Sequence, residues 1–114
     1  MKVRIYQIDS EKDSARLIFG NAELFEAEGV PLDALPREIY EPVFEGELEA
    51  RDLEGIYSIL QRRRERPFPA GYSGRSLSCS DVVEILERGD FLLCEAEGLW
   101  FVDSFGFKPC GWAE

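Results

Sequence analysis

The polar residues most able to do chemistry lie in two short segments of the chain. The first, residues 76–81, carries three serines and ends in an aspartate, and the second is Asp103 with Ser104. A nucleophilic serine needs a base to take its proton, usually histidine or lysine, and the chain contains no histidine. The neighbouring Arg75 cannot accept a proton at neutral pH. Since Ser and Asp readily hydrogen-bond the backbone at turns and caps, we expect a structural polar network rather than a catalytic site. Its members are Ser76, Ser78, Ser80, Asp81, Asp103 and Ser104.

Two roles are open for Asp103. It falls on the same face of an expected strand as Leu99 and Phe101, where an unpaired carboxylate is costly. With Asp81 it could form a metal-binding or acid/base pair, as two carboxylates with shifted pKa values do. Alternatively, it accepts hydrogen bonds from Ser104 or from the backbone of residues 76–80 and holds that loop against the sheet. We favour the structural role.

The cysteines and glycines give no sign of a metal or cofactor site. Cys79, Cys94 and Cys110 are widely spaced, and no Cys-x-x-Cys pair occurs. A zinc site is therefore not expected, because its usual ligands are missing or scattered, and we expect reduced, partly buried thiols. Gly71 and Gly74 are not followed by Gly-Lys-Ser/Thr, so they do not form a phosphate-binding loop. The sequence predicts no catalytic residue, no metal and no cofactor.

Acidic residues dominate the charge of the chain. The net charge is −10, and residues 20–56 alone carry eleven acidic residues against two arginines. Affinity for nucleic acid comes largely from Lys and Arg, so we expect a basic partner protein rather than direct nucleic-acid binding. The alternative is a solvated surface that only favours solubility. The candidate interaction face consists of four glutamates from one extended segment: Glu41, Glu45, Glu47 and Glu49.

Hydrophobic periodicity predicts the elements before residue 50. Alternation over residues 3–8 and a short apolar run at 15–19 predict a β-hairpin. Asn21 and Gly29 are suited to begin and end a short helix. Residues 39–49 are expected to be extended, and Pro42 makes them an edge strand or a broken one.

A second helix is predicted near residues 52–64, followed by a loop at 67–76. Its apolar stripe has spacing i, i+3, i+4 and i+7 and consists of Leu53, Ile56, Tyr57 and Leu60. Asp52 stands at its beginning and a group of arginines at residues 62–64 and 66 near its end, which complements the helix dipole. Because no aromatic residues interleave with these arginines, we do not read them as a nucleic-acid site.

The last third of the chain is expected to be strand-rich. Residues 81–87, 91–96 and 99–107 are predicted strands joined by turns, and the run 99–102 is apolar on both faces, as in a central strand. Residues 81–86 also fit a short helix, and periodicity alone leaves both interpretations open. The predicted fold class is α+β. It is a single domain over residues 1–114, with a mostly antiparallel sheet of about five strands and two helices packed on one face.

No feature of the sequence directs the chain to a membrane. No apolar run approaches the roughly 20 residues that cross a bilayer. The N-terminus lacks the apolar stretch and cleavage site of a signal peptide. We therefore expect a cytoplasmic protein without membrane contact.

Four segments of the chain form a set of motifs in a fixed order: residues 39–48, residues 52–57, Gly-Arg-Ser-Leu-Ser-Cys-Ser-Asp-Val-Val at 74–83 and Val-Asp-Ser-Phe-Gly-Phe at 102–107. Together they resemble the YodL-like family. The first segment is similar to the family's aromatic-rich strand and the second to its helix start, and the last two motifs are the more specific ones. The family commonly has His where this chain has Arg75, and the stretch between residues 83 and 99 is longer here.

The resemblance implies a fold and a setting rather than a reaction. Members of the family are small domains of Gram-positive bacteria, often carried on mobile elements, with no assigned biochemical activity. Our first hypothesis is a non-enzymatic interaction domain whose acidic face binds a basic partner, with a DNA-mimic role as a special case. The alternative is a small-ligand binder or an enzyme with a pocket between residues 76–81 and Asp103.

Overall fold

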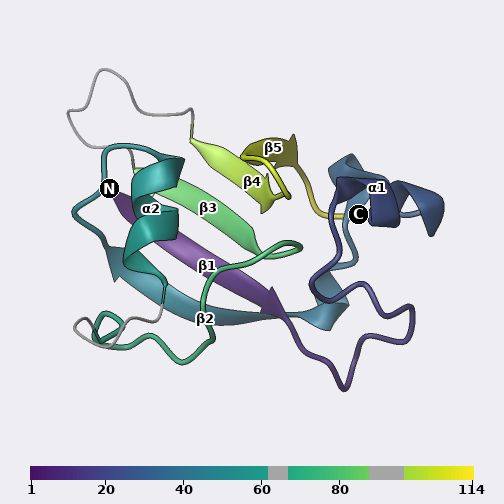
Figure 1. Cartoon of the computed structure of the whole chain (residues 1–114), viewed down its shortest axis with the longest axis horizontal. Coiled ribbons are helices and arrows are strands. Elements are labelled where there is room, and N and C mark those ends of the chain that lie inside the picture. Colours follow the sequence, from purple (N-terminus) through teal and green to yellow (C-terminus); the bar gives the residue numbers. More distant parts are fainter. Residues whose placement is uncertain (62–66, 88–96) are drawn as a thin grey trace.

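Five antiparallel strands form the centre of the molecule (Figure 1). The structure is a computed structural model that describes residues 1–61, 67–87 and 97–114. The sheet order is β2-β1-β3-β4-β5, and every neighbouring pair is antiparallel. The strands are β1 (Lys2–Ile8), β2 (Tyr40–Glu47), β3 (Val82–Glu87), β4 (Gly98–Val102) and β5 (Phe107–Cys110).

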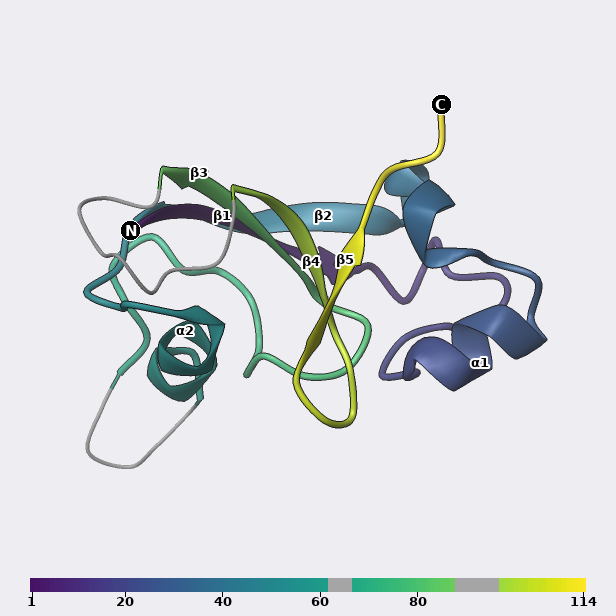
Figure 2. The ribbon, with the colours of Figure 1, turned by 90° about the horizontal axis from the view of Figure 1, so that it is seen from above.

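In the described residues, two short helices accompany the sheet. Helix α1 (Ala22–Ala27) and helix α2 (Leu53–Ile59) lie on the same side of the sheet, at opposite ends of it (Figure 2). Two single 3₁₀ turns, Leu32–Ala34 and Arg37–Ile39, lead from α1 into β2. The predicted α+β class with a five-stranded antiparallel sheet is confirmed. Among the described helices, none has the length and apolarity to cross a membrane.

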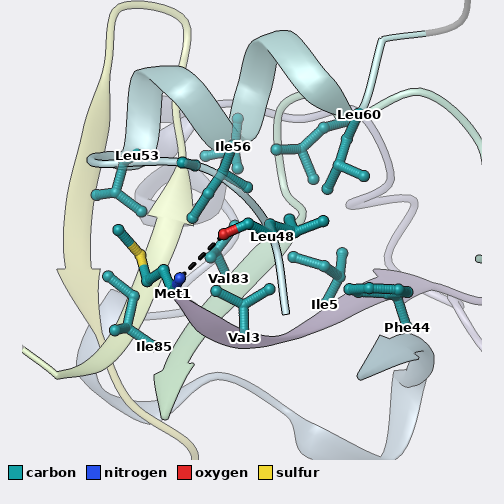
Figure 3. Close-up of a cluster of buried hydrophobic side chains, with 13 residues drawn as sticks. Met1, Val3, Ile5, Phe44, Leu48, Leu53, Ile56, Leu60, Val83 and Ile85 are labelled. Carbon is teal, nitrogen blue, oxygen red and sulfur yellow. Dashed lines mark hydrogen bonds between the residues drawn. The ribbon is translucent and has the colours of Figure 1, made fainter. Parts of the chain in front are cut away.

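Helix α2 covers one hydrophobic cluster of the sheet (Figure 3). The Asp52 carboxylate accepts a hydrogen bond from the Gly55 N–H at 2.8 Å and so begins the helix. Ile56 is fully buried against a cluster that includes Val3 and Val83. Burying an Ile side chain contributes about 1.5–3 kcal/mol, so these contacts, more than helix propensity, hold this short helix.

A second hydrophobic cluster lies next to α1. Phe25 of α1 meets Phe101 of β4 edge to face, with ring centroids 4.9 Å apart. Tyr6 belongs to this cluster, whereas its neighbour Ile5 belongs to the first one. Since successive residues of a strand point to opposite faces, β1 is buried on both sides from Ile5 to Ile8.

Several predicted elements agree with the structure in type and place. Asn21 caps α1, its side chain accepting a hydrogen bond from the Leu24 N–H. Strand β2 is an edge strand, as the presence of Pro42 requires. Residues 82–87 form a strand, which decides between the two interpretations of that segment. Strand β4 is paired on both sides, as its two-sided apolarity predicts, although the middle strand of the five is β3.

The predicted strand at residues 15–19 is wrong. The Asp13 carboxylate accepts hydrogen bonds from the N–H groups of Leu17 and Ile18 at 2.9 and 2.8 Å, and the segment is a compact loop. Arg16 and Phe19 adopt positive φ angles of 55° and 64° within it. A side chain that binds the backbone competes with strand pairing, and β1 pairs with β2 and β3 instead.

Two boundaries also differ from the prediction. Helix α2 ends at Ile59 rather than near residue 64, because the next carbonyl, of Leu60, accepts a hydrogen bond from the Leu77 N–H at 3.0 Å. The expected strand 99–107 is two strands, separated by a turn in which the Asp103 N–H bonds the Gly106 carbonyl. Gly106 has a φ of 82°, a conformation that glycine adopts without strain. The predicted strand at 91–96, the turn at 88–90 and the arginines at 62–64 and 66 lie outside the described residues.

Candidate functional site

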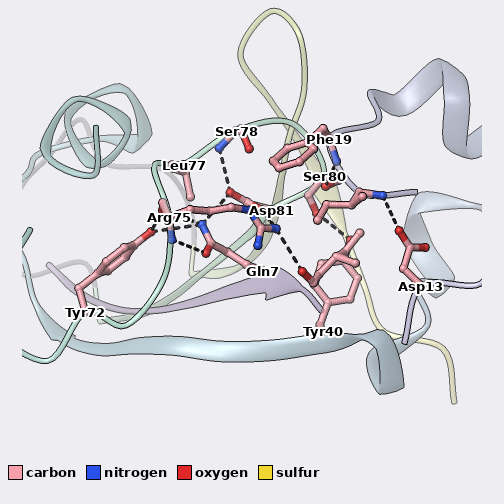
Figure 4. A network of polar contacts seen from close by, with 12 residues as sticks. Gln7, Asp13, Phe19, Tyr40, Tyr72, Arg75, Leu77, Ser78, Ser80 and Asp81 are labelled. Atoms are coloured by element: carbon pink, nitrogen blue, oxygen red, sulfur yellow. Dashed lines mark hydrogen bonds and ion pairs between the residues drawn. The ribbon is translucent and has the colours of Figure 1, made fainter. Parts of the chain in front are cut away.

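Asp81 is the centre of a buried polar network at the start of β3 (Figure 4). Its side chain is fully buried. The Oδ2 atom accepts hydrogen bonds from the Ser78 N–H at 2.8 Å and from the Gln7 side chain at 3.1 Å. The carboxylate therefore joins the loop before β3 to strand β1.

Gln7 connects the same network to the loop that follows α2. Its amide group donates to the Arg75 carbonyl at 2.9 Å and to the Tyr72 hydroxyl at 3.2 Å. Its carbonyl oxygen accepts from the Arg75 N–H at 3.0 Å. A Cβ atom at Gly74 would stand 2.3 Å from this oxygen, so the close approach of the loop to β1 requires glycine at this position.

Arg75 occupies the position where the family resemblance leads us to expect histidine. Its guanidinium group lies 3.8 Å from Asp81 Oδ1, donates to the Ile8 carbonyl at 3.2 Å, and sits over the Phe19 ring at 5.0 Å. Because arginine stays protonated, it can balance the charge of Asp81 but cannot act as a base.

Burial governs the protonation of Asp81. It raises the pKa of this carboxyl to about 7, against the opposing effects of the Ser78 hydrogen bond, the Arg75 charge and the Gln7 amide. Within the part of the chain that the structure describes, three buried atoms of the network have no hydrogen-bond partner: Asp81 Oδ1, Arg75 Nε and Ser78 Oγ. Low solvation of these groups explains why burial outweighs the favourable contacts.

Ser80 connects the loop at residues 15–19 to strand β2. Its hydroxyl accepts a hydrogen bond from the Phe19 N–H at 3.0 Å, and its carbonyl accepts one from the Tyr40 hydroxyl at 2.7 Å. Ser80 is fully buried and has a φ of 78°. Ser76 and Ser78 are half-buried in the same loop.

Asp103 contacts a different segment from the one expected. Its Oδ1 accepts hydrogen bonds from the N–H groups of Ala22 and Ser104 at 3.0 and 2.9 Å, and Lys108 lies 3.5 Å from Oδ2. The Ser104 contact was predicted, but the loop that Asp103 holds is the beginning of α1, not residues 76–80. The reason is that β4 ends at Val102, so the turn carries the carboxylate toward the unpaired first N–H groups of α1.

The electrostatics of Asp103 differ from those of Asp81. Burial raises the pKa of Asp103, but the N–H groups of Ala22 and Ser104 and the charge of Lys108 outweigh burial, and the net pKa lies below its ordinary value. Over residues 1–61, 67–87 and 97–114, Asp81 and Asp103 share no hydrogen-bond partner. This gives no support to an acid/base pair. Within the described residues, no three Cys, Asp or Glu side chains group closely enough to hold a metal ion.

The four glutamates of the candidate interaction face lie on or just after the edge strand β2. Glu45 and Glu47 stand opposite Arg4 and Lys2 of β1, and Glu45 forms an ion pair with Arg4. Glu47 lies 3.4 Å from the amino terminus. Glu41 pairs with Lys12, and Glu49 is exposed beyond the end of the strand. Three of the four acids thus have a basic neighbour within the chain.

Gln7, Tyr72 and Gly74 also belong to this structural network, and their place in it was not predicted from the sequence. The only signal for Gln7 is a polar side chain at the end of an apolar alternation, in the half of β1 where both faces prove to be buried. Tyr72 and Gly74 lie in a segment predicted only as a surface loop.

The family comparison covers nearly the whole chain. A family model described as YodL-like domain matches residues 2–112. No curated protein and no solved structure shows a significant match.

Proposed function

The chain belongs to the YodL-like domain family, and we propose that it is a non-enzymatic interaction domain that binds a basic protein through its acidic face. The observation that carries this proposal is the row of exposed glutamates along the edge strand. The side chains of Glu45 and Glu47 are 51% and 71% exposed, and Glu49 is exposed beyond them. They alternate with less exposed residues, so the three carboxylates lie along one border of the sheet.

The internal ion pairs of these glutamates are compatible with binding a partner. Exposed ion pairs contribute only about 0–1 kcal/mol, because water screens them and the two side chains lose conformational freedom when they pair. Lysine or arginine residues of a partner can therefore replace Arg4 or the amino terminus at small cost. The large excess of acid in residues 20–56 further raises the rate of encounter with a basic protein.

The polar network supports this proposal over the alternative of a ligand pocket or enzyme. Ser80 and Asp81 are fully buried, and their hydrogen bonds hold loops to the sheet. Asp103 does line open surface grooves, but its Oδ1 is used to hold the beginning of α1. The polar groups of the expected pocket are thus engaged in holding the fold.

The proposal is tested by capture of the partner at low and high salt. The tagged chain is incubated with bacterial cytoplasmic extract, and retained proteins are identified by mass spectrometry. We expect a basic protein that is released at high salt and that is lost with the triple variant Glu45→Gln, Glu47→Gln, Glu49→Gln. The matched control removes the same charge from α1, by Glu23→Gln, Glu26→Gln and Glu28→Gln. If both triple variants retained the basic protein equally well, binding through this face would be refuted.

A DNA-mimic role is the special case of this proposal. We infer a cytoplasmic partner, and the mobile-element setting that the family resemblance implies makes a DNA-binding protein the first class to examine. Duplex DNA added to the captured complex should then displace the partner from the chain. A complex that duplex DNA leaves intact would exclude the mimic role while leaving the acidic-face proposal standing.

A further inference from the structure

The turn between β4 and β5 is held rigidly at its base. Asp103 bonds the backbone of Ala22 and Ser104, and the Asn21 side chain donates to the Ser104 hydroxyl at 3.2 Å. The Asp103 N–H bonds the Gly106 carbonyl at 3.0 Å across the turn. These contacts fix the turn between α2 and α1, on the side of the sheet where both helices lie (Figure 2).

Within the motif of residues 102–107, Phe105 is the one residue whose side chain has no role inside the fold. Val102 is buried, and Phe107 packs against the first hydrophobic cluster. The Phe105 side chain, in contrast, is 97% exposed at the tip of the turn. A large aromatic side chain that is fully solvated on a rigid support is suited to enter a partner, because little conformational freedom is lost on binding.

The surface around Phe105 is hollowed on both sides. A groove of about 270 Å³ separates it from α2 and is lined by Glu54, Tyr57 and Phe107 among others. Tyr57 was predicted on the buried stripe of α2, yet its side chain is 38% exposed. A second groove, of about 490 Å³, separates Phe105 from α1 and includes Glu23 and Lys108.

The geometry points to the groove between Phe105 and Tyr57 as the docking site for a basic protein segment, one that carries an arginine or lysine beside an apolar side chain. The apolar side chain packs between the two rings, and the cation meets Glu54 or the face of a ring. This inference rests on the proposed function for the positive charge of the partner, and it adds a contact surface separate from strand β2.

Charge complementarity identifies this occupant. Among the described residues, the groove is lined by the acids Glu54 and Asp103 and by no basic residue, and Asp103 is ion-paired with Lys108 outside this lining. A second copy of the chain would bring another net charge of −10 to the same surface, and like charges oppose such a contact. A cationic and partly apolar segment complements both the rings and the Glu54 carboxylate.

The test uses a library of random 12-residue peptides displayed on phage and selected on the whole chain. Dissociation constants of the enriched peptides are then measured for the wild type and three variants. Phe105→Ala removes the exposed ring and, at 97% exposure, leaves the fold intact, which the melting temperature verifies. Phe19→Ala removes another exposed ring that lines neither groove, and the Glu45, Glu47, Glu49 to Gln variant neutralises the β2 face.

We expect the enriched peptides to contain Arg or Lys beside an apolar residue. We expect their dissociation constants for Phe105→Ala to be at least tenfold higher than those for the wild type and for Phe19→Ala. Peptides that bind Phe105→Ala as well as the wild type would overturn the inference. If those same peptides bound the Glu45, Glu47, Glu49 to Gln variant more weakly than the wild type, the proposed function would survive that result. Enrichment of acidic peptides, or no enrichment at all, would also overturn the docking site.

Discussion

The Asp103 carboxylate accepts a hydrogen bond from the Ala22 N–H at 3.0 Å and so joins the β4–β5 turn to the beginning of α1. These residues are far apart in the sequence, and the contact supplies a partner to one of the N–H groups that a helix start leaves free. The same oxygen accepts the Ser104 N–H, which fixes the turn itself. One side chain therefore positions two segments that flank the exposed Phe105.

Asp103→Ala should destabilise the chain. Loss of an acceptor at a helix start costs about 0.5–2 kcal/mol, and the lost Lys108 contact adds little because it is exposed to solvent. Urea denaturation followed by circular dichroism measures this difference. Glu23→Ala, an exposed change in the first turn of the same helix, is the control. An unchanged midpoint for Asp103→Ala would contradict the role of this contact.

Asp81→Asn should remove a pH dependence of stability. The pKa of Asp81 is raised to about 7 in the fold by burial, so between its ordinary value and about 7 the folded state holds a proton that the unfolded state lacks. Stability from this group is therefore present at acidic pH and is lost as pH rises through about 7. At 1.36 kcal/mol per unit, the wild type should gain about 2–3 kcal/mol relative to Asp81→Asn between pH 8 and pH 5.

The pH prediction is measured as the difference in unfolding free energy between the two proteins across that range. Using the difference cancels the titration of the other carboxyl groups, including Asp103, whose lowered pKa has the opposite effect. A difference that stays constant with pH would show that Asp81 is charged throughout, balanced by Arg75.

Gly74→Ala should separate the loop of residues 67–80 from strand β1. The new Cβ atom would stand 2.3 Å from Gln7 Oε1 and 2.9 Å from Val43 Cγ2. Relieving this overlap costs about 1–3 kcal/mol and lengthens the hydrogen bonds between Gln7 and Arg75. Faster hydrogen exchange at the Arg75 N–H, relative to Ser73→Ala in the same loop, would report the change. Unaltered exchange would contradict the tight approach.

The elements that sequence analysis could predict are those whose own residues decide them. The capped helices at Asn21 and Asp52 and the edge position of the Pro42 strand follow from local chemistry. The loop at residues 15–19 could not be predicted, because its apolar run resembles a strand while the Asp13 side chain binds its backbone. The end of α2 depends on Leu77, which lies far along the chain.

The candidate site was predicted in composition but not in arrangement. The hydrogen-bonding residues Ser80, Asp81 and Asp103 were identified from their types. Their partners could not be, because Gln7 and Ala22 reach them only through sheet pairing and the direction of a turn. The exposure of Phe105 could not be predicted either, because the sequence predicts one strand through residue 107, whereas the structure has a turn between β4 and β5.

Binding through the acidic face is tested most directly by calorimetric titration of the captured partner. The titration compares the wild type with the β2 variant Glu45→Gln, Glu47→Gln, Glu49→Gln and with the α1 control Glu23→Gln, Glu26→Gln, Glu28→Gln. The two variants carry the same net charge and differ only in where it was removed. We predict that the β2 variant binds at least tenfold more weakly, about 1.4 kcal/mol, while the α1 control stays within about twofold of the wild type. Equal affinities for the two variants would contradict recognition through the β2 face.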